Sequence, residues 1–378
     1  MRLSETEAAG LWLGRVWQPD LGPCVVTLRD GALCDITNRN APTVRDVLEL
    51  DEAADYIRNA PSNQVWPLSE LGDPSDERAT HMLAPCDLQA VKACGVTFAQ
   101  SMVERVIEEQ AAGDPAKANE IRARVSEIIG DSLDQIEAGS EQAAAVKAEL
   151  IGLGLWSQYL EVGIGPDAEV FSKAQPLSAM GTGADVGLHP MSRWNNPEPE
   201  IVLAVNSKGA IQGACLGNDV NLRDVEGRSA LLLSKAKDNN ASCALGPMIR
   251  VFDDSYDLDH VRRATLNLTV RGLDGFVLNG QSDMAQISRD PTDLVRQTIG
   301  RHHQYPDGFM LFLGTLFAPT KDRDEPGEGF THKIGDSVTI ASSGLGQLEN
   351  RVTLSTECAE WTFGLAAFMR NLAGRNLI

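Results

Sequence analysis

The chain contains the segment Trp194-Asn-Asn-Pro-Glu198-Pro-Glu200-Ile-Val-Leu-Ala-Val205, in which two carboxylates one residue apart lead into an apolar run. The run predicts a β-strand, and side chains two positions apart on a strand point to the same side. The carboxylates of Glu198 and Glu200 can therefore reach one point. Because two carboxylates this close repel each other, a divalent cation with oxygen ligands between them is the usual solution.

A third carboxylate is expected beside this pair. After the turn Ser207-Lys-Gly-Ala210, a second apolar stretch ends in Cys215-Leu-Gly-Asn-Asp219. The two stretches predict a hairpin, which would return Asp219 to Glu198 and Glu200. The two glutamates alone have a simpler interpretation, since strands at a protein surface also point polar side chains outward at every second residue. The metal interpretation depends on the whole set of acids and on a lysine further along the chain.

The composition excludes several classes of protein. With 378 residues, 43% of them hydrophobic, the chain can bury a large core, which excludes a disordered protein. The formal net charge of -20 argues against binding to nucleic-acid backbone, which requires clustered Lys and Arg. The seven cysteines are scattered and form no CxxC pair, as expected of reduced thiols in a cytoplasmic protein. Neither an export signal nor an apolar run of about 18 residues occurs, so we expect no membrane partner.

Two domains are expected. Residues 1–85 alternate short strand signals with turns, which predicts a small α+β N-terminal domain. Residues 86–378 would form the second, larger domain, in which residues 101–161 carry apolar side chains at helical spacing and predict two or three amphipathic helices. Strands are predicted near residues 11–17, 24–28, 33–37, 169–173, 200–206, 210–216, 248–252, 264–272, 309–313, 337–342 and 350–354, and a further strand is predicted to end at Gly95. Further helices are predicted near residues 43–57, 290–304 and 357–370.

A candidate catalytic lysine follows the third carboxylate. Lys237 lies in Leu233-Ser-Lys-Ala-Lys237-Asp-Asn-Asn240, together with Lys235. A lysine beside a bound cation can act as a base if burial and the charge of the metal destabilise its ammonium group. The local sequence does not choose between the two lysines, and a solvated lysine is the simpler interpretation of each.

Several motifs occur in one order along the chain. They are Gly95-Val-Thr-Phe98, Phe171-Ser-Lys173, Glu198-Pro-Glu200, Gly217-Asn-Asp219-Val-Asn-Leu-Arg223-Asp224, Asn279-Gly280, Gly314-Thr315 and Gly335-Asp336. Over roughly residues 85–356 this order resembles the fumarylacetoacetate hydrolase superfamily. Agreement of several separate motifs is more specific than any one of them.

The resemblance implies a fold, a metal and a class of substrate. The fold is α+β, with a mixed β-roll catalytic domain that follows the small N-terminal domain and contains the helical insertion. Glu198, Glu200 and Asp219 would hold Mg²⁺ or Mn²⁺, which a 2-oxo acid chelates through its carboxylate and its 2-oxo oxygen. The resemblance also implies a homodimer or a dimer of dimers. Placing the family's lysine without gaps selects Lys237 over Lys235.

One departure from the family pattern concerns the reaction. Hydrolytic members carry a His followed three residues later by Glu in the lid, and this pair activates water for C–C bond cleavage. Here Ser101 takes the His position, whereas Glu104 keeps the acid. The change points to the sugar-acid dehydratase branch of the family. Its members convert 2-keto-3-deoxypentonates to 2-oxoglutarate semialdehyde in pentose catabolism.

The resemblance to that branch assigns roles to single residues. Lys237 or Glu104 would remove a proton from C3, and Glu104 would protonate the departing C4 hydroxyl. Contacts with the 2-oxo sugar acid are expected from five further residues: Ser101, Arg105, Lys173, Asn218 and Thr315. The alternative is a hydrolase that splits an acylpyruvate or a 2,4-diketo-3-deoxy sugar acid at a C–C bond, with Glu104 alone positioning the water.

Overall fold

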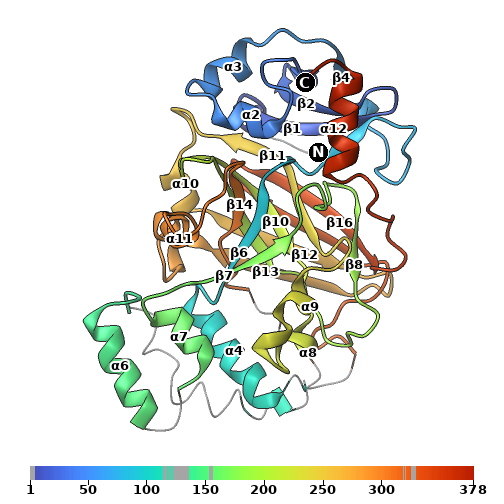
Figure 1. Cartoon of the computed structure of the whole chain (residues 1–378). Coiled ribbons are helices and arrows are strands. Elements are labelled where there is room, and N and C mark those ends of the chain that lie inside the picture. The colour runs from blue at the N-terminus through green and yellow to red at the C-terminus, as the bar shows by residue number, and fades with distance from the viewer. Residues whose placement is uncertain are drawn as a thin grey trace.

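Two β-sheets form the centre of the molecule, as Figure 1 shows. The computed structural model describes residues 5–112, 114, 117–118, 121, 136–152, 156–317, 319, 321–324 and 329–378. The N-terminal strands and both chain termini lie at one end of the molecule. At the other end lie the helices α4 (Ala99–Ala111), α6 (Glu141–Gly152) and α7 (Gln158–Ile164). Mixed sheets with separate helical regions make this an α+β fold, which confirms the predicted class.

The larger sheet runs from the N-terminal region into the rest of the chain. Its strands are β1 Trp12–Gln18, β2 Gly22–Arg29, β3 Ala32–Asp35, β4 Val65–Pro67, β5 His81–Leu83, β6 Ala90–Gly95, β7 Glu169–Ala174, β9 Pro199–Val205, β10 Ile211–Asp219, β11 Cys243–Val251 and β14 Phe309–Phe312. Their order is β4-β3-β2-β1-β11-β10-β9-β14-β6-β7, and β5 pairs with β1. The antiparallel pairing of β1 with β11 joins the N-terminal strands to the later ones.

The smaller sheet covers one face of the larger one. Its strands are β8 Asp185–Leu188, β12 Thr265–Arg271, β13 Val277–Asp283, β15 Ser337–Ser342 and β16 Gly346–Leu354, in the order β13-β12-β15-β16-β8. In β12, buried Leu266, Leu268 and Val270 alternate with more exposed polar residues. This alternation is typical of a sheet with one face on a core and one face in solvent.

The other helices are short. They are α1 Glu5–Ala8, α2 Val44–Glu49, α3 Ala53–Asn59, α8 Arg223–Glu226, α9 Leu233–Lys237, α10 Leu258–Arg262, α11 Pro291–Thr298 and α12 Leu365–Gly374. Thr43 caps α2 as its position suggests, because its side chain accepts a hydrogen bond from the backbone N–H of Asp46. None of the helices in the described ranges has the length and apolar character needed to cross a bilayer.

The hairpin of β9 and β10 positions the candidate site. β9 is buried along its whole length because both of its faces are covered. Ile201 packs in the core between the two sheets, and Val202 packs in the core on the opposite face of the larger sheet. Burial on both faces explains why the strand reads as a continuous apolar run. The register places Gly217 opposite Glu200, so that β10 ends at Asp219 beside the start of β9. The predicted hairpin is confirmed.

Some predicted elements differ in the structure. The helix predicted over residues 43–57 is two helices, α2 and α3, and the final helix begins at Leu365 rather than near residue 357. The strands β8 and β13 and the short helices α8 and α9 were not predicted, because each is too short or too polar for a clear apolar period. The part of the predicted helical stretch at residues 122–135 lies outside the described residues.

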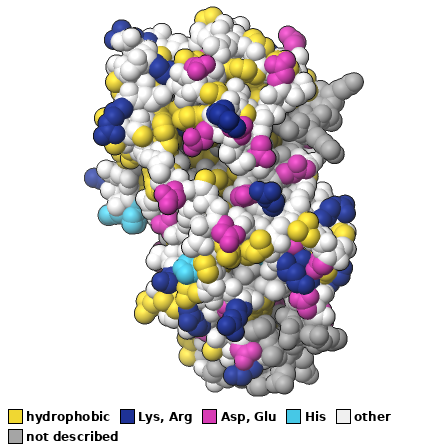
Figure 2. All heavy atoms as spheres, turned by 90° about the vertical axis from the view of Figure 1, so that its right-hand side faces the viewer, with side chains coloured by type: hydrophobic (Ala, Val, Ile, Leu, Met, Phe, Trp, Pro, Cys, Tyr) yellow, Lys and Arg dark blue, Asp and Glu magenta, His cyan; other side chains and the backbone are white. Residues whose placement is uncertain are grey.

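The surface carries both signs of charge. On the face that Figure 2 shows, acidic and basic side chains are interspersed with apolar ones. Within the described part of this face, Lys and Arg side chains do not gather into a separate basic tract.

Gly217 allows β10 to pack closely against its neighbours. A Cβ atom at this position would lie 2.3 Å from Cε1 of Phe312 and 2.5 Å from Cγ2 of Val202. Both distances are shorter than van der Waals contact, and both neighbours are buried in the core. A larger residue would therefore force core side chains out of their positions.

We predict that Gly217→Ala destabilises the fold by about 1–3 kcal/mol, because overpacking of a closely packed core costs this much. The free energy of unfolding would be measured by urea denaturation. Gly300→Ala is the matched control, since a Cβ atom at Gly300 would meet nothing within 4 Å. Equal unfolding midpoints for the two variants would contradict the close packing at Gly217.

Candidate metal centre and active site

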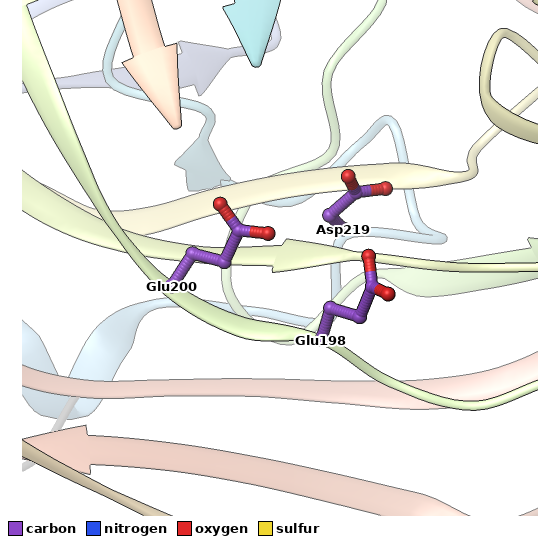
Figure 3. Close-up of side chains that lie close together, drawn as sticks. All are labelled: Glu198, Glu200 and Asp219. Carbon is purple, nitrogen blue, oxygen red and sulfur yellow. The ribbon is translucent and has the colours of Figure 1, made fainter. Parts of the chain in front are cut away.

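Three buried carboxylates meet at the end of the β9–β10 hairpin. Glu198 directly precedes β9, Glu200 is its second residue, and Asp219 is the last residue of β10. One carboxylate oxygen from each lies within 4.8 Å of the others. Figure 3 shows the three side chains gathered at one place. The structure thus brings together the three residues that the sequence nominated as metal ligands.

The charges of these carboxylates are unequally stabilised. Burial and the negative charges of Asp219 and Glu198 raise the pKa of Glu200 well above its usual value. The backbone N–H of Gly314 donates a 2.7 Å hydrogen bond to Glu200, which offsets this only in part. Burial also raises the pKa of Asp219, but the ammonium groups of Lys173 and Lys237 outweigh burial, so that the net pKa is lowered. The triad therefore concentrates negative charge that an added cation would relieve.

Lys237 is the last residue of α9, and its ammonium group lies directly on the triad. Its Nζ atom is 2.6 Å from Oε2 of Glu198 and 3.0 Å from Oδ2 of Asp219. Burial lowers the pKa of Lys237, but the two carboxylates outweigh this effect and the pKa is raised. The alternative lysine, Lys235, is exposed to solvent. Of the two, only Lys237 lines the pocket described below.

A pocket opens above the triad. Its described lining includes ionisable residues from α4, α8, α9, β7 and the β9–β10 hairpin together with polar and apolar residues. The lining residues are Cys94, Gly95, Val96, Ser101, Glu104, Arg105, Glu169, Phe171, Asn196, Glu198, Glu200, Asp219, Asn221, Arg223, Glu226, Lys237, Gly314, Thr315 and Phe317. The pocket is therefore strongly polar, with more acids than bases.

Two helices that line the pocket exchange ion pairs. Arg105 of α4 contacts Oε1 of Glu198 at 2.8 Å and Oε2 of Glu226 of α8 at 3.0 Å. In the opposite direction, Arg223 of α8 contacts Oε2 of Glu104 of α4 at 3.4 Å. The guanidinium of Arg223 also lies over the ring of Trp194, 4.2 Å from its centroid. Each helix thus supplies one acid and one base to the other.

Ser101 and Thr315 both line the pocket. The Ser101 hydroxyl donates a 2.8 Å hydrogen bond to the carbonyl of Phe98 at the start of α4. The Thr315 hydroxyl accepts a 3.1 Å hydrogen bond from the backbone N–H of Phe317. Both hydroxyls therefore help to hold the local backbone while they face the pocket.

Two residues expected to contact substrate do not line the pocket. Lys173 is fully buried, and its Nζ atom contacts Oδ1 of Asp219 at 2.9 Å and the carbonyl of Lys237 at 2.6 Å. It supports the triad from behind rather than from the pocket side. Asn218 is also fully buried, and it points to the opposite face of β10 because side chains alternate along a strand. Neither residue is therefore among the described lining residues of the pocket, and their contact with substrate stays a prediction.

Glu169, an acid in the pocket wall, was not predicted from the sequence as a site residue. Glu169 opens β7 and lies so close to Gly95 that a Cβ atom there would be 2.0 Å from its Oε2. Burial and the charge of Glu226 raise the pKa of Glu169 to about 7, against the opposing effect of Arg105. The sequence does contain a signal for Glu169, which precedes Phe171 by two residues on a predicted strand, so that both side chains are expected on the same side. In the structure both residues line the pocket.

Two asparagines add neutral oxygen atoms to the pocket. Asn196 and Asn221 pair through their backbones, N–H to carbonyl in both directions, at 3.1 and 3.0 Å. The side-chain amide of Asn221 donates a 3.0 Å hydrogen bond to Oε1 of Glu198. Among the described residues, no donor reaches the buried Oδ1 atom of either asparagine. Each of these oxygen atoms is therefore a buried acceptor without a donor among the described residues.

The triad fits a divalent cation of the Mg²⁺ type. All three groups are carboxylates, which are the ligands that hard cations prefer. The ammonium group of Lys237 already contacts two of these carboxylates, Glu198 and Asp219, which shows that positive charge is accommodated beside them. Burial and the neighbouring carboxylates raise the pKa of Glu200, an effect that a bound cation would oppose. Glu198, Glu200 and Asp219 are therefore suitable metal ligands.

Comparisons with known proteins identify the fold. Residues 165–353 match the model of the fumarylacetoacetate (FAA) hydrolase C-terminal family. The chain is 25% identical over 327 residues to the probable 2-keto-3-deoxyxylonate dehydratase of Haloferax volcanii, covering 86% of this chain and 93% of that protein. It is 28% identical over 225 residues to the 2-dehydro-3-deoxy-D-arabinonate dehydratase of Saccharolobus solfataricus, covering 59% and 70%.

A solved structure shares the fold. It is a 2-keto-3-deoxy-D-arabinonate dehydratase complexed with magnesium and 2,5-dioxopentanoate. The match has a TM-score of 0.61 at 20% identity and covers 90% of this chain and 98% of the other. The resemblance inferred from the motifs is confirmed, and with it the predicted fold type.

We predict that Mg²⁺ raises the melting temperature by about 2–5 °C at about 100-fold excess over its Kd, because only the folded chain gathers the three ligands. Glu200→Gln should remove most of this shift. In chelator the same variant should melt no lower than the native protein, because the pKa of Glu200 shows that the fold disfavours its charge. Differential scanning calorimetry measures both effects. Glu70→Gln, at an exposed acid, should keep the full shift, and a full shift in Glu200→Gln would contradict the assignment.

Proposed function

Because this chain belongs to the fumarylacetoacetate hydrolase family, we propose that it is a Mg²⁺-dependent dehydratase of a 2-keto-3-deoxy sugar acid, a hydro-lyase. The substrate would be 2-keto-3-deoxypentonate and the product 2-oxoglutarate semialdehyde, which is 2,5-dioxopentanoate. The main support is one arrangement: a buried lysine and three carboxylates share a pocket with Glu169, whose pKa is raised to about 7. The names of the two similar dehydratases support the same class of reaction.

The reaction removes one water and moves hydrogen within the substrate. A proton leaves C3 and the C4 hydroxyl leaves as water, which forms a C3–C4 double bond. The resulting 5-hydroxy enone isomerises, so that C5 becomes the aldehyde and C3 and C4 carry two hydrogens each. A base near C3 and an acid near C4 are required. Bound to Glu198, Glu200 and Asp219, Mg²⁺ would acidify the C3 protons of the chelated 2-oxo acid.

We assign the base to Lys237 and the acid to Glu169. Lys237 is the buried amine that lines the pocket at the triad, and its ammonium group donates hydrogen bonds to Glu198 and Asp219. With a cation held by those carboxylates, the ammonium group would lose their stabilisation, so that it could release its proton to solvent and act as a base. Glu169 has a pKa raised to about 7, so it can still hold a proton to donate near neutral pH. Glu104, the acid expected from the sequence, is paired with Arg223 and is better suited to binding a substrate hydroxyl.

The roles of the remaining site residues are proposed from whether each residue lines the pocket. Ser101, Arg105 and Thr315 line it, and we propose that they contact the sugar-acid substrate. Lys173 is proposed to hold Asp219 in place from behind. We further propose that Mn²⁺ can replace Mg²⁺ at the same oxygen ligands. A homodimer or dimer of dimers, a cytoplasmic location, a role in pentose breakdown and a boundary between domains near residue 85 remain part of the proposal.

Incubation with 2-keto-3-deoxypentonate and Mg²⁺ should release 2,5-dioxopentanoate, measured by mass spectrometry. Lys237→Met should lower kcat by about 10²-fold or more, because loss of a positioned base removes this much of the rate. Lys235→Met should keep the native rate, because Lys235 is exposed. Pyruvate release from an acylpyruvate, without any dehydration, would instead favour the C–C bond hydrolase.

The pH dependence tests Glu169. Its pKa is raised to about 7, so it is protonated below that pH and loses the proton to be donated as pH rises. We expect kcat/KM to fall on the alkaline side of about pH 7 for this reason. Glu169→Gln should lower kcat by about 10²-fold and remove that alkaline limb. Glu104→Gln should retain the limb; if it removed the limb and Glu169→Gln did not, Glu104 would be the acid.

A further inference from the structure

Three carboxylates line the pocket in addition to the metal triad. They are Glu104 on α4, Glu169 on β7 and Glu226 on α8. Glu104 and Glu226 are buried, with 7% and 5% of their surface exposed. The charge of Glu226 contributes to the raised pKa of Glu169, which indicates that these two acids lie near each other. We call these three residues the acidic wall.

The cations that line the pocket are already engaged with carboxylates. Lys237 contacts Glu198 and Asp219. Arg105 lies between Glu198 and Glu226, at 2.8 and 3.0 Å. Arg223 contacts Glu104 and the carbonyl of Pro319, both at 3.4 Å. A second negative group on a ligand would therefore have to break an existing ion pair or remain beside the acidic wall, and both are costly in a buried site.

The wall offers mostly hydrogen-bond acceptors. Carboxylates accept and do not donate when ionised. Asn196 and Asn221 also line the pocket, and the buried Oδ1 atom of each has no donor among the described residues. A hydroxyl group can donate to such atoms, whereas a carboxylate cannot. An ammonium group could also donate, but the substrate of the proposed function carries hydroxyl groups and no ammonium group. Between a hydroxyl group and a carboxylate at the far end of that substrate, the wall therefore favours the hydroxyl group.

Resting on the proposed function, we infer that the acidic wall selects 2-oxo acids with an uncharged, hydroxyl-bearing far end and rejects dicarboxylates, with Glu226 as a specificity-determining residue. Glu226 acts in two ways. Its charge repels a carboxylate, and its ion pair with Arg105 keeps that guanidinium from binding one. Both effects disappear when the carboxylate is replaced by an amide.

The proposed selection also bears on the reaction that would consume the product of dehydration. Two-electron oxidation of the aldehyde carbon of the proposed product by a separate enzyme, with water as the source of oxygen and a hydride acceptor such as a nicotinamide cofactor as the oxidant, would give 2-oxoglutarate, a dicarboxylate of the same chain length. The acidic wall would keep this compound out of the pocket. An aldehyde-oxidising reaction could therefore consume the product without its own product inhibiting the dehydration step.

Two ligands that differ only at the far end test the inference. 2-Oxopentanoate ends in a methyl group and 2-oxoglutarate ends in a carboxylate, and the remaining atoms are the same. Isothermal titration of the Mg²⁺-loaded enzyme would give both Kd values without requiring turnover. We expect 2-oxoglutarate to bind at least about tenfold more weakly than 2-oxopentanoate, as a like charge near the wall would cause.

Glu226→Gln should reduce that ratio of Kd values by about tenfold, because it removes one charge and releases Arg105. Glu104→Gln should act in the same direction by releasing Arg223, and it serves as the second variant if Glu226→Gln does not fold. Glu70→Gln makes the same chemical change at an exposed site and should leave the ratio unchanged. Circular dichroism would establish that each variant is folded.

The outcomes separate this inference from the proposed function. Equal affinities for the two ligands in the native enzyme, or an unchanged ratio in both folded wall variants, would overturn the selection even if dehydration is observed. Discrimination that the wall variants reduce, in an enzyme that does not dehydrate 2-keto-3-deoxypentonate, would support the wall and overturn the reaction. If neither 2-oxo acid bound in the presence of Mg²⁺, both proposals would be overturned.

Discussion

The repulsion among Glu198, Glu200 and Asp219 is the constraint on which the site depends. Three buried carboxylates so close together are unfavourable unless positive charge compensates them. The chain supplies that charge from three directions: Lys173 behind Asp219, Lys237 across Glu198 and Asp219, and Arg105 beside Glu198. The hairpin of β9 and β10 holds the acids in place because apolar cores cover both of its faces. Hydrophobic packing therefore maintains an electrostatic arrangement that would otherwise push the strands apart.

The pocket above the triad extends the same principle to the helices. α4 and α8 are joined by ion pairs in both directions, Arg105 with Glu226 and Arg223 with Glu104. These pairs are partly or fully buried, so each partner would be strongly destabilising if left alone. The positions of the two helices are consequently coupled to each other and, through Arg105 and Glu198, to the triad itself. A change in charge at the triad must alter the balance of forces on α4.

The local sequence predicted the three carboxylates of the triad better than the residues of the surrounding pocket wall. The period of two and the turn at residues 207–210 were enough to bring Asp219 to the glutamates, since both signals lie within one hairpin. The pairing of Arg223 with Glu104 joins residues 119 positions apart, and no local pattern encodes such a contact. Glu169 lies on a predicted strand, but no local pattern indicates its raised pKa, which depends on burial and on the charge of Glu226. Burial and long-range pairing are properties of the fold, which is why the wall was missed.

The two lysines at the triad can be distinguished by their other partners. The Nζ atom of Lys173 contacts Asp219 and is also bonded to the carbonyls of Lys237 and Val220 and to the Ser242 hydroxyl. Removing one carboxylate would leave it held by the backbone. The close polar contacts of the Lys237 Nζ atom are with carboxylates, and the ring of Phe171 lies 5.8 Å away. The pKa of Lys237 is accordingly raised by the negative charge on the triad, against the opposing effect of burial. For this reason the same cluster can contain one lysine that keeps the acids in place and another that can change its protonation state.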